Sequence, residues 1–240
     1  MPYKFPELKK YTINYDLLFS QLSKIAKNKL FSDENLTTNY ISIFIDKMKE
    51  AELEFQNSIK KPNEKKRLTN YYFETQIFHI PIFFDSQTIF IHFRITEILN
   101  ILKTQPDNLI ENIPKNKFTG VHAKYKTSPT DKLGSTPNSA PIIAVPYPYE
   151  YYDFLIIDGN NRIERTLHDP KITHYPVAHI EPNSLISNKL FCSRFDSVFY
   201  TLHCDTAILA NLKENHSFND EKLLEHTILN TGRLAIEYLI

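Results

Sequence analysis

The chain is poor in several residue types on which common classes of protein depend. Its 240 residues include only two cysteines and four glycines, and no tryptophan. Cys192 and Cys204 are too few for a disulfide framework and form no Cys-x-x-Cys pair, which excludes zinc knuckles and thioredoxin-like redox motifs. Each lies in an amphipathic pattern, where cysteine acts as a small apolar residue, so neither is expected to be catalytic. No Walker, Rossmann or G-x-S-x-G motif occurs.

The chain also lacks an excess of charge of either sign and long apolar runs. Lys+Arg 28 and Asp+Glu 28 give a formal net charge of zero, so no overall field draws the protein to nucleic acid or to an anionic membrane. No apolar run is long enough to span a bilayer, and the amino terminus lacks the apolar core of a signal peptide. Together with the sparse cysteine, this predicts a soluble, cytoplasmic protein without a membrane partner.

What the chain does contain is a sharp change from strand to helix within residues 154–167. Phe154–Ile157 is an apolar run typical of a buried strand, whereas Ile163 and Leu167 lie four apart, as on one face of a helix. Gly159 stands at the change, where a positive φ or a close approach is easily accommodated. A helix beginning after Gly159 would direct its first N–H groups into the turn, which suits an anion.

Two arginines accompany this turn. Arg162 and Arg165 are three apart and are expected to rise beside it, with Ile163 holding the helix on the sheet. Arg162 is then the main contact to an anionic ligand, and its loss should change the melting temperature little. The alternative is an Asx-type turn that caps an amphipathic helix carrying two solvated arginines.

The segment Asp158–Arg162 resembles the D-G-x-H-R or G-x-x-R loop of the ParB/sulfiredoxin-like superfamily. In that family the loop follows a strand, opens a helix and binds nucleotide phosphates, and here Pro141–Val145 and Tyr175–Ile180 are predicted as the flanking strands. The resemblance, which covers about 140–181, implies an α+β fold with a mixed sheet and helical extensions at both ends. It implies that a nucleotide or another phosphorylated ligand binds at Asp158, Gly159, Asn160, Asn161, Arg162 and Arg165.

The loop departs from the family pattern at two positions. Where sulfiredoxins carry a catalytic cysteine this chain has Asn160, so repair of sulfinic acid is not expected. The usual histidine is Asn161, which can hydrogen-bond but holds no proton at neutral pH. Binding of phosphate therefore fits the residues better than proton transfer does.

Catalysis would depend first on Asp158. A carboxylate at the end of a strand can hold Mg²⁺ beside a nucleotide, or accept a proton from an attacking hydroxyl, although aspartate is equally a favoured turn residue. A further base is not assigned among the nearby carboxylates, Glu150, Glu164 and Glu181. Three classes stay open: a phosphotransferase or nucleotide hydrolase, a nucleotide-gated DNA-binding protein of the partition type, and a catalytically inactive interaction module. The absence of a recognisable helix-turn-helix counts against DNA.

Three histidines and a long irregular segment lie near the turn in the sequence. A metal site would need His168, His174 and His179 to converge, and the strand pattern around His179 favours a half-buried, hydrogen-bonded residue. The irregular segment Lys115–Ala140 is either an ordinary mobile loop or a lid whose lysines and hydroxyls fold over a polyphosphate. His203-Cys204-Asp205 resembles a triad only in sequence, and such triads arise by spatial convergence.

The first part of the chain is predicted to be helical. Apolar residues recur at helical spacing in Leu17–Leu30 and in Ile41–Ile59. The basic run Lys60–Arg67, with proline at its third position, is expected to be a solvated connection. No aromatic residue is interleaved with its lysines, so it is not expected to be a strong nucleic-acid site. We therefore predict a helical extension over 1–67 and an α+β core with C-terminal helices over 68–240, with one compact domain overall as the alternative.

Within that core the pattern changes twice. Ile77–Phe84 and Thr88–Phe93 are aromatic and β-branched and predict a β-hairpin, with Pro81 at an edge or a bulge. Helical spacing returns from Leu190 to Leu212 and again after Asn219, a capping residue. These helices are expected to pack around the central sheet.

Overall fold

The protein is described here by a computed structural model. It describes residues 3–4, 9–26, 30–84, 87–104, 110–119, 123–124, 140–147 and 154–231. This part of the chain is α+β, as the sequence predicts, and includes a five-stranded mixed sheet. It forms two compact units: unit 1 comprises Met1–Arg94 and Ile186–Ile240, and unit 2 comprises Ile95–Leu185. The units therefore do not divide after Arg67, where the sequence placed a boundary.

Unit 1 begins with a short antiparallel pair, β1 (Tyr3–Lys4) and β2 (Lys9–Lys10), followed by the two predicted helices. These are α1 (Tyr15–Ala26) and α2 (Glu34–Ile59). The Asp33 side chain caps α2 by accepting hydrogen bonds from its first backbone N–H groups. No helix in the described ranges is long and apolar enough to cross a membrane.

The basic run at residues 60–67 is a connection only at its first two residues. Helix α3 (Pro62–Glu74) runs through it, with Pro62 in the first turn. Proline is well tolerated there because the first N–H groups of a helix have no intrahelical acceptor. Helix α2 thus ends before the proline, as the sequence predicts, but a new helix begins at Pro62, which was not expected. Lys65 and Lys66 lie on this helix, whose inner side is held by buried Leu68.

The predicted hairpin is confirmed as β3 (Ile77–Phe84) paired with β4 (Gln87–Arg94). Pro81 lies opposite Phe90, whose N–H points away from β3 and donates to the Tyr11 hydroxyl at 3.0 Å. When one residue of an opposed antiparallel pair directs its N–H group away from the partner strand, the residue opposite does the same. The nitrogen of Pro81 therefore points away from β4, toward the outer edge of β3. No ladder bond is lost there, which explains why this strand accepts a proline.

The outer edge of β4 is closed by a segment from far along the chain. The Arg94 N–H donates to the Leu190 carbonyl at 2.9 Å, and the Cys192 N–H donates to the His92 carbonyl at 3.1 Å. The segment between them adds an isolated antiparallel bridge to β4. The two pieces of unit 1 thus adjoin where unit 2 leaves and returns.

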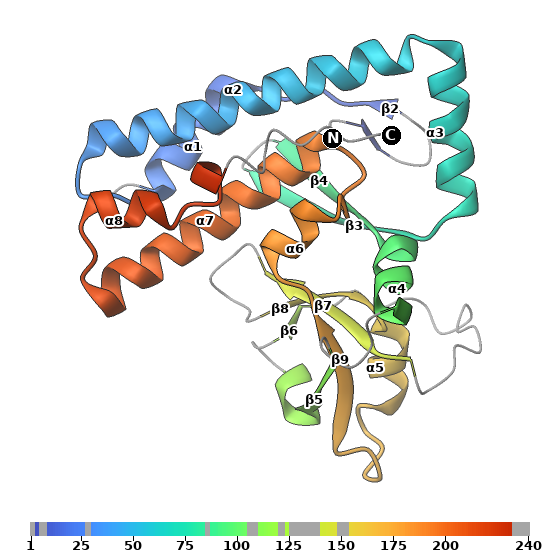
Figure 1. The fold of residues 1–240 in the computed structure, drawn as a ribbon. Helices are drawn as coiled ribbons and strands as arrows, with labels where there is room; N and C mark the ends of the chain where they lie inside the picture. Colours follow the sequence, from blue (N-terminus) through green and yellow to red (C-terminus); the bar gives the residue numbers. More distant parts are fainter. Residues whose placement is uncertain are drawn as a thin grey trace. The chain divides into compact units, whose positions relative to one another are not determined.

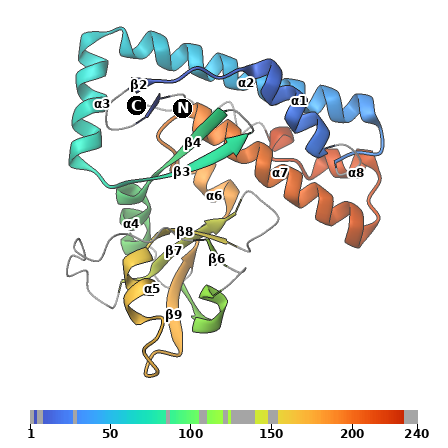
Figure 2. The ribbon, with the colours of Figure 1, turned by 180° about the vertical axis from the view of Figure 1, so that it is seen from behind.

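Helix α7 (Arg194–His216) lies at the centre of unit 1, where it packs against α2 and β4 (Figure 1). Seen from behind, the hairpin crosses α7 (Figure 2). Its residues 195–205 are all buried, because neighbours cover the helix on more than one side. Two short elements follow, α8 (Asp220–Glu225) and the 3₁₀ helix η3 (Leu229–Thr231), and Asn219 caps α8 as predicted. Residues 232–240, where helical spacing was also expected, lie outside the described residues.

Unit 2 is built on the mixed sheet, in the spatial order β5-β9-β7-β8-β6. In that order the strands are Ile110–Pro114, His174–His179, Ile142–Pro146, Phe154–Asp158 and Ala123–Lys124. Strand β9 is antiparallel to β5 and parallel to β7, whereas β8 is antiparallel to β7 and parallel to β6. The predicted succession of strand, strand, helix and strand is present as β7, β8, α5 and β9.

The helical elements of unit 2 are short. Within the described residues they are α4 (Ile95–Thr104), the 3₁₀ helix η1 (Lys115–Phe118), α5 (Asn160–Thr166) and the start of α6 (Pro182–Ser187). Within α6 the chain passes back into unit 1.

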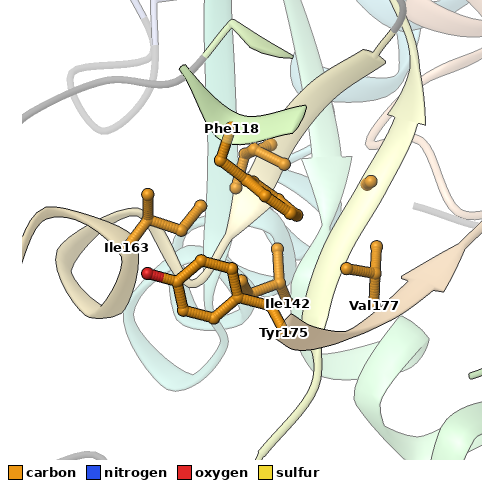
Figure 3. Packing of buried hydrophobic residues seen from close by; sticks show 7 residues of the cluster. Phe118, Ile142, Ile163, Tyr175 and Val177 are labelled. Carbon is orange, nitrogen blue, oxygen red and sulfur yellow. The ribbon is translucent and has the colours of Figure 1, made fainter. Parts of the chain in front are cut away.

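One apolar cluster joins α5 and η1 to the sheet (Figure 3). Ile163 of α5 and Phe118 of η1 are fully buried, and Tyr175 of β9 lies near both, with its ring centroid 5.0 Å from that of Phe118. The Tyr175 hydroxyl is also 2.8 Å from the Thr166 hydroxyl at the end of α5. The predicted role of Ile163 in fixing the helix on the sheet is confirmed.

Candidate functional site

The turn between β8 and α5 has the conformation that the sequence predicts. Gly159 has φ 94° and ψ 5°, in the left-handed region, and precedes the first residue of α5. A Cβ added to it would lie 3.0 Å from Cγ1 and 3.3 Å from Cα of Ile142. Glycine is thus required both by the backbone conformation and by close packing on β7. On this side the turn contacts protein, so the glycine does not open space for a ligand there.

Helix α5 has a weaker positive end than the sequence suggests. It has seven residues, and Gly159 provides no side chain to cap it. A helix of two turns aligns few peptide dipoles, so its positive end is weak. Attraction for an anion at this turn must come mainly from the two arginines.

Arg162 is buried, contrary to expectation. Its side chain is only 4% exposed, and Nη1 donates to the carbonyl of Ala140, just before β7. Its Nε is buried without a hydrogen-bond partner, and within the described residues no carboxylate forms an ion pair with it. Arg162 is therefore part of the packing between α5 and the chain before β7.

The electrostatic setting of this guanidinium is unusual for arginine. Burial lowers the pKa of Arg162, the charge of Asp158 raises it, and the like charge of Arg165 lowers it further. A buried cation that is not neutralised at close range is destabilising, and an anion bound nearby would relieve that cost.

The other predicted residues are more accessible. Asp158, Gly159, Asn160 and Asn161 are half-buried, whereas Arg165 is exposed. The Arg165 Nε donates to the Asn161 carbonyl at 3.2 Å, which holds the guanidinium along the first turn of α5. The structure thus keeps all six predicted residues in one short segment, with Arg162 inside and Arg165 outside.

The segment Lys115–Ala140 is partly regular. Its first residues form η1 and deliver Phe118 to the core, and Lys115 Nζ donates to the Asp169 carbonyl at 2.8 Å. Lys115 is therefore a structural lysine and not part of a lid, and the description of this whole segment as irregular was wrong. Residues 125–139, which hold the remaining lid candidates, lie outside the described residues.

The expected partners of the turn are not drawn together. Among the described residues no group of three or more His, Cys, Asp or Glu could hold a metal ion. His168 and His174 are exposed, and His179 is exposed rather than half-buried, with Nδ1 3.8 Å from Glu181 Oε1. Glu164 is half-buried on α5, and Glu150 lies outside the described residues. Asp158 is the carboxylate placed within the turn itself.

Unit 1 holds buried polar residues whose roles the sequence did not indicate. Asp205 Oδ2 accepts a hydrogen bond from the Tyr40 hydroxyl at 2.5 Å, and its carboxylate also accepts from the Ile228 N–H at 2.9 Å. His92 Nδ1 is 3.1 Å from Asp196 Oδ1, and the Ser193 hydroxyl donates to Asp196 Oδ2 at 2.8 Å. All these groups are buried, and their hydrogen bonds join α7 and its cap to neighbouring segments, so their evident role is to fix α7 against them. The sequence gave no sign of these contacts, because each of them joins residues that local patterns do not relate.

Comparison with known proteins does not add to this picture. No family model, no curated protein and no solved structure matches the chain. Functional inference therefore depends on the geometry of the turn and on the residues that form it.

Proposed function

We propose that unit 2 binds a phosphorylated ligand, with a nucleotide as the favoured class, at residues 158–165. The observation that carries the proposal is Arg162, a 4% exposed guanidinium with an unpartnered Nε. Arginine is costly at such a position unless an anion lies nearby, and its planar fork of donors suits phosphate oxygens.

The neighbouring residues support the same chemistry. Exposed Arg165 supplies a second guanidinium within one turn of helix, and Asn160 and Asn161 supply amide donors and acceptors. A phosphate at this segment would contact exposed Arg165 and neutral donors and would lie in the field of buried Arg162, which suits a dianionic group. The resemblance of Asp158–Arg162 to the ParB-like loop favours a nucleotide over a simple phosphate.

Asp158 gives the site a group through which turnover could occur. At the end of β8 its carboxylate can hold Mg²⁺ beside a polyphosphate, or accept the proton of an attacking water or hydroxyl. Its negative charge acts on Arg162, so the two side chains are close enough to influence one another. We propose binding as the primary function, with phosphotransfer or hydrolysis as the activity that Asp158 would support.

The test is a thermal-shift screen of the full chain with ATP, CTP, GTP and inorganic phosphate, each with and without Mg²⁺. A ligand that binds only the folded state at 100 times its Kd raises the melting temperature of a chain of this size by about 5 to 10 °C. Arg165→Ala should weaken binding by about 1.5 to 3 kcal/mol, since it removes a hydrogen bond to a charged group at an exposed position.

Lys171→Ala is the matched control, because Lys171 is also an exposed cation of unit 2 but follows the turn at a distance along the chain. It should bind like the unaltered protein. Equal losses in the Arg165 and Lys171 variants would mean that the turn is not the site. No shift with any of the four compounds at millimolar concentration would remove the proposal altogether.

A further inference from the structure

Helix α3 (Pro62–Glu74) carries a concentrated positive charge on a chain whose formal net charge is zero. The run at residues 60–67 holds five cationic side chains and a single carboxylate, Glu64. Lys61, Lys65 and Lys66 are exposed, and within the described residues none of them forms an ion pair. Arg67 differs, because its Nη2 lies 2.8 Å from Glu64 Oε2.

This placement does not serve the stability of the helix. Cations are unfavourable near the amino end of a helix, and that is where these lysines stand. Lys61 and Lys65 are also four apart, the spacing at which like charges repel one another across one turn. A function of this surface, and not the stability of the helix, would account for lysines at these positions.

An exposed aromatic ring completes the surface. Phe73 is 74% exposed, and it lies seven residues after Lys66 on the same face of α3, with exposed Asn70 between them. Its ring is held edge-to-face against that of Tyr72, with the centroids 5.7 Å apart. The amino-acid order hid this neighbourhood, because the helix brings Phe73 beside a basic run that contains no aromatic residue of its own.

We infer that this face of α3, formed by Lys65, Lys66, Asn70 and Phe73, binds single-stranded nucleic acid, independently of the function proposed for unit 2. Lysines pair with phosphates whatever the sequence, an exposed ring stacks on a base, and an amide hydrogen-bonds to base edges. An anionic membrane fits less well, because insertion needs a continuous apolar face and Phe73 is flanked by polar residues.

The test measures fluorescence anisotropy of a labelled 20-nucleotide oligothymidylate with the full chain at several salt concentrations. Phe73→Ala should weaken binding about five- to 100-fold through loss of base stacking. The double variant Lys65→Gln/Lys66→Gln should weaken it about tenfold and reduce the slope of log affinity against log salt by about 1.4, as expected for two lost phosphate contacts on a single strand.

Matched controls separate this surface from general charge and exposure. Phe83 is 73% exposed on β3, so Phe83→Ala removes an equally exposed ring elsewhere in the chain. Lys24→Gln/Lys103→Gln removes two exposed helical lysines from other helices. Both controls should bind the oligonucleotide as the unaltered protein does, with unchanged circular dichroism in every variant.

Two results would overturn the inference. One is the absence of measurable oligonucleotide binding, or equal loss in the Phe73 and Phe83 variants. The other is cosedimentation with phosphatidylserine vesicles that depends on Lys65, Lys66 and Phe73 while oligonucleotide binding does not. That second outcome would reassign the face to a membrane surface.

Discussion

At Arg162 the requirements of folding oppose those of the ligand binding that we propose. The side chain is buried beside the chain before β7, yet its charge has no ion-pair partner within the described residues. The sequence indicated the chemistry of this residue but not its burial, because arginine is rarely buried and the pattern of α5 assigned Ile163 and Leu167 to the sheet. The Ala140 carbonyl, which accepts a hydrogen bond from Arg162, belongs to a residue 22 positions earlier in the chain. No local sequence pattern indicates this tertiary contact.

Arg162→Met should separate the two requirements. Methionine fills most of the same volume, so loss of the hydrogen bond to Ala140 costs about 1 kcal/mol, while removal of an unpaired buried charge offsets it. We expect the free energy of unfolding in denaturant to stay unchanged or to rise, and the ligand-induced thermal shift to vanish. Arg162→Ala should instead lower stability by about 2 to 4 kcal/mol, since it leaves a cavity. If both variants lost the same stability, the guanidinium would be satisfied by the fold alone.

Gly159 is limited both by its backbone conformation and by the space beside it. Gly159→Ala should lower the free energy of unfolding by about 1 to 3 kcal/mol, from a positive φ and a Cβ at 3.0 Å from Ile142. Gly159→Asn distinguishes the causes, because asparagine tolerates the left-handed region but also carries a Cβ. We expect it to recover only a small part of the loss in urea titrations. Stability equal to that of the unaltered protein would show that φ alone makes glycine necessary.

At the scale of helices and strands, the sequence predicted the elements that depend on patterns within a single segment. The hairpin β3–β4 and the helices α1 and α2 follow from periodicity and capping within each segment. The proline correctly marks the end of α2, but the helix that begins at Pro62 was not predicted, although Leu68 and the tyrosines after it keep helical spacing. The order of the five-stranded sheet was not predictable in this way, since β9 lies between β5 and β7 through pairings distant in sequence.

Helix α7 carries two buried groups, Asp205 and His203, whose titrations change the stability of the protein in opposite directions as pH rises. Burial raises the pKa of Asp205 from 3.8 to about 6, so the folded state binds the proton more tightly, and stability falls as pH rises from about 4 to about 6. Burial lowers the pKa of His203 from 6.5 to about 4, so the unfolded state binds the proton more tightly, and stability rises over about the same range. The two contributions nearly cancel in the unaltered protein.

Replacing one of the two groups should reveal how the other makes the free energy of unfolding change with pH. Asp205→Asn should leave a stability that increases by roughly 1 to 3 kcal/mol between pH 4 and pH 6.5, whereas His203→Gln should leave one that decreases by a similar amount. The measurement is the free energy of unfolding in urea at half-unit steps of pH. Parallel profiles for the two variants would contradict the opposed titrations.

On the scale of the whole molecule, unit 2 is an insertion into unit 1. The chain leaves unit 1 at Arg94 and returns within α6, and the Arg94 N–H is bonded to the Leu190 carbonyl at 2.9 Å. Because these residues adjoin, a short connection can replace everything between them without stretching the hairpin.

A chain in which residues 95–188 are replaced by a short Gly-Ser linker should therefore fold. Its core, formed by α2, the hairpin and α7, keeps its packing, and we expect helical circular dichroism with one cooperative thermal transition. A control with the same linker and Phe199→Asp, which buries a charge in that core, should not fold cooperatively. Loss of cooperativity in the linker protein itself would mean that unit 1 depends on unit 2.

The insertion also sets an order of events during synthesis on the ribosome. The apolar face of the hairpin, with Ile80, Ile82 and Phe84, is buried in the finished protein, and the Phe84 ring lies 5.8 Å from that of Phe199 on α7. At about 5 to 20 residues per second, α7 is translated roughly 5 to 20 s after the hairpin, while unit 2 is completed in between. Throughout that interval the faces of α2 and of the hairpin that pack on α7 lack this partner on the nascent chain, so we expect both to be segments that a chaperone would bind.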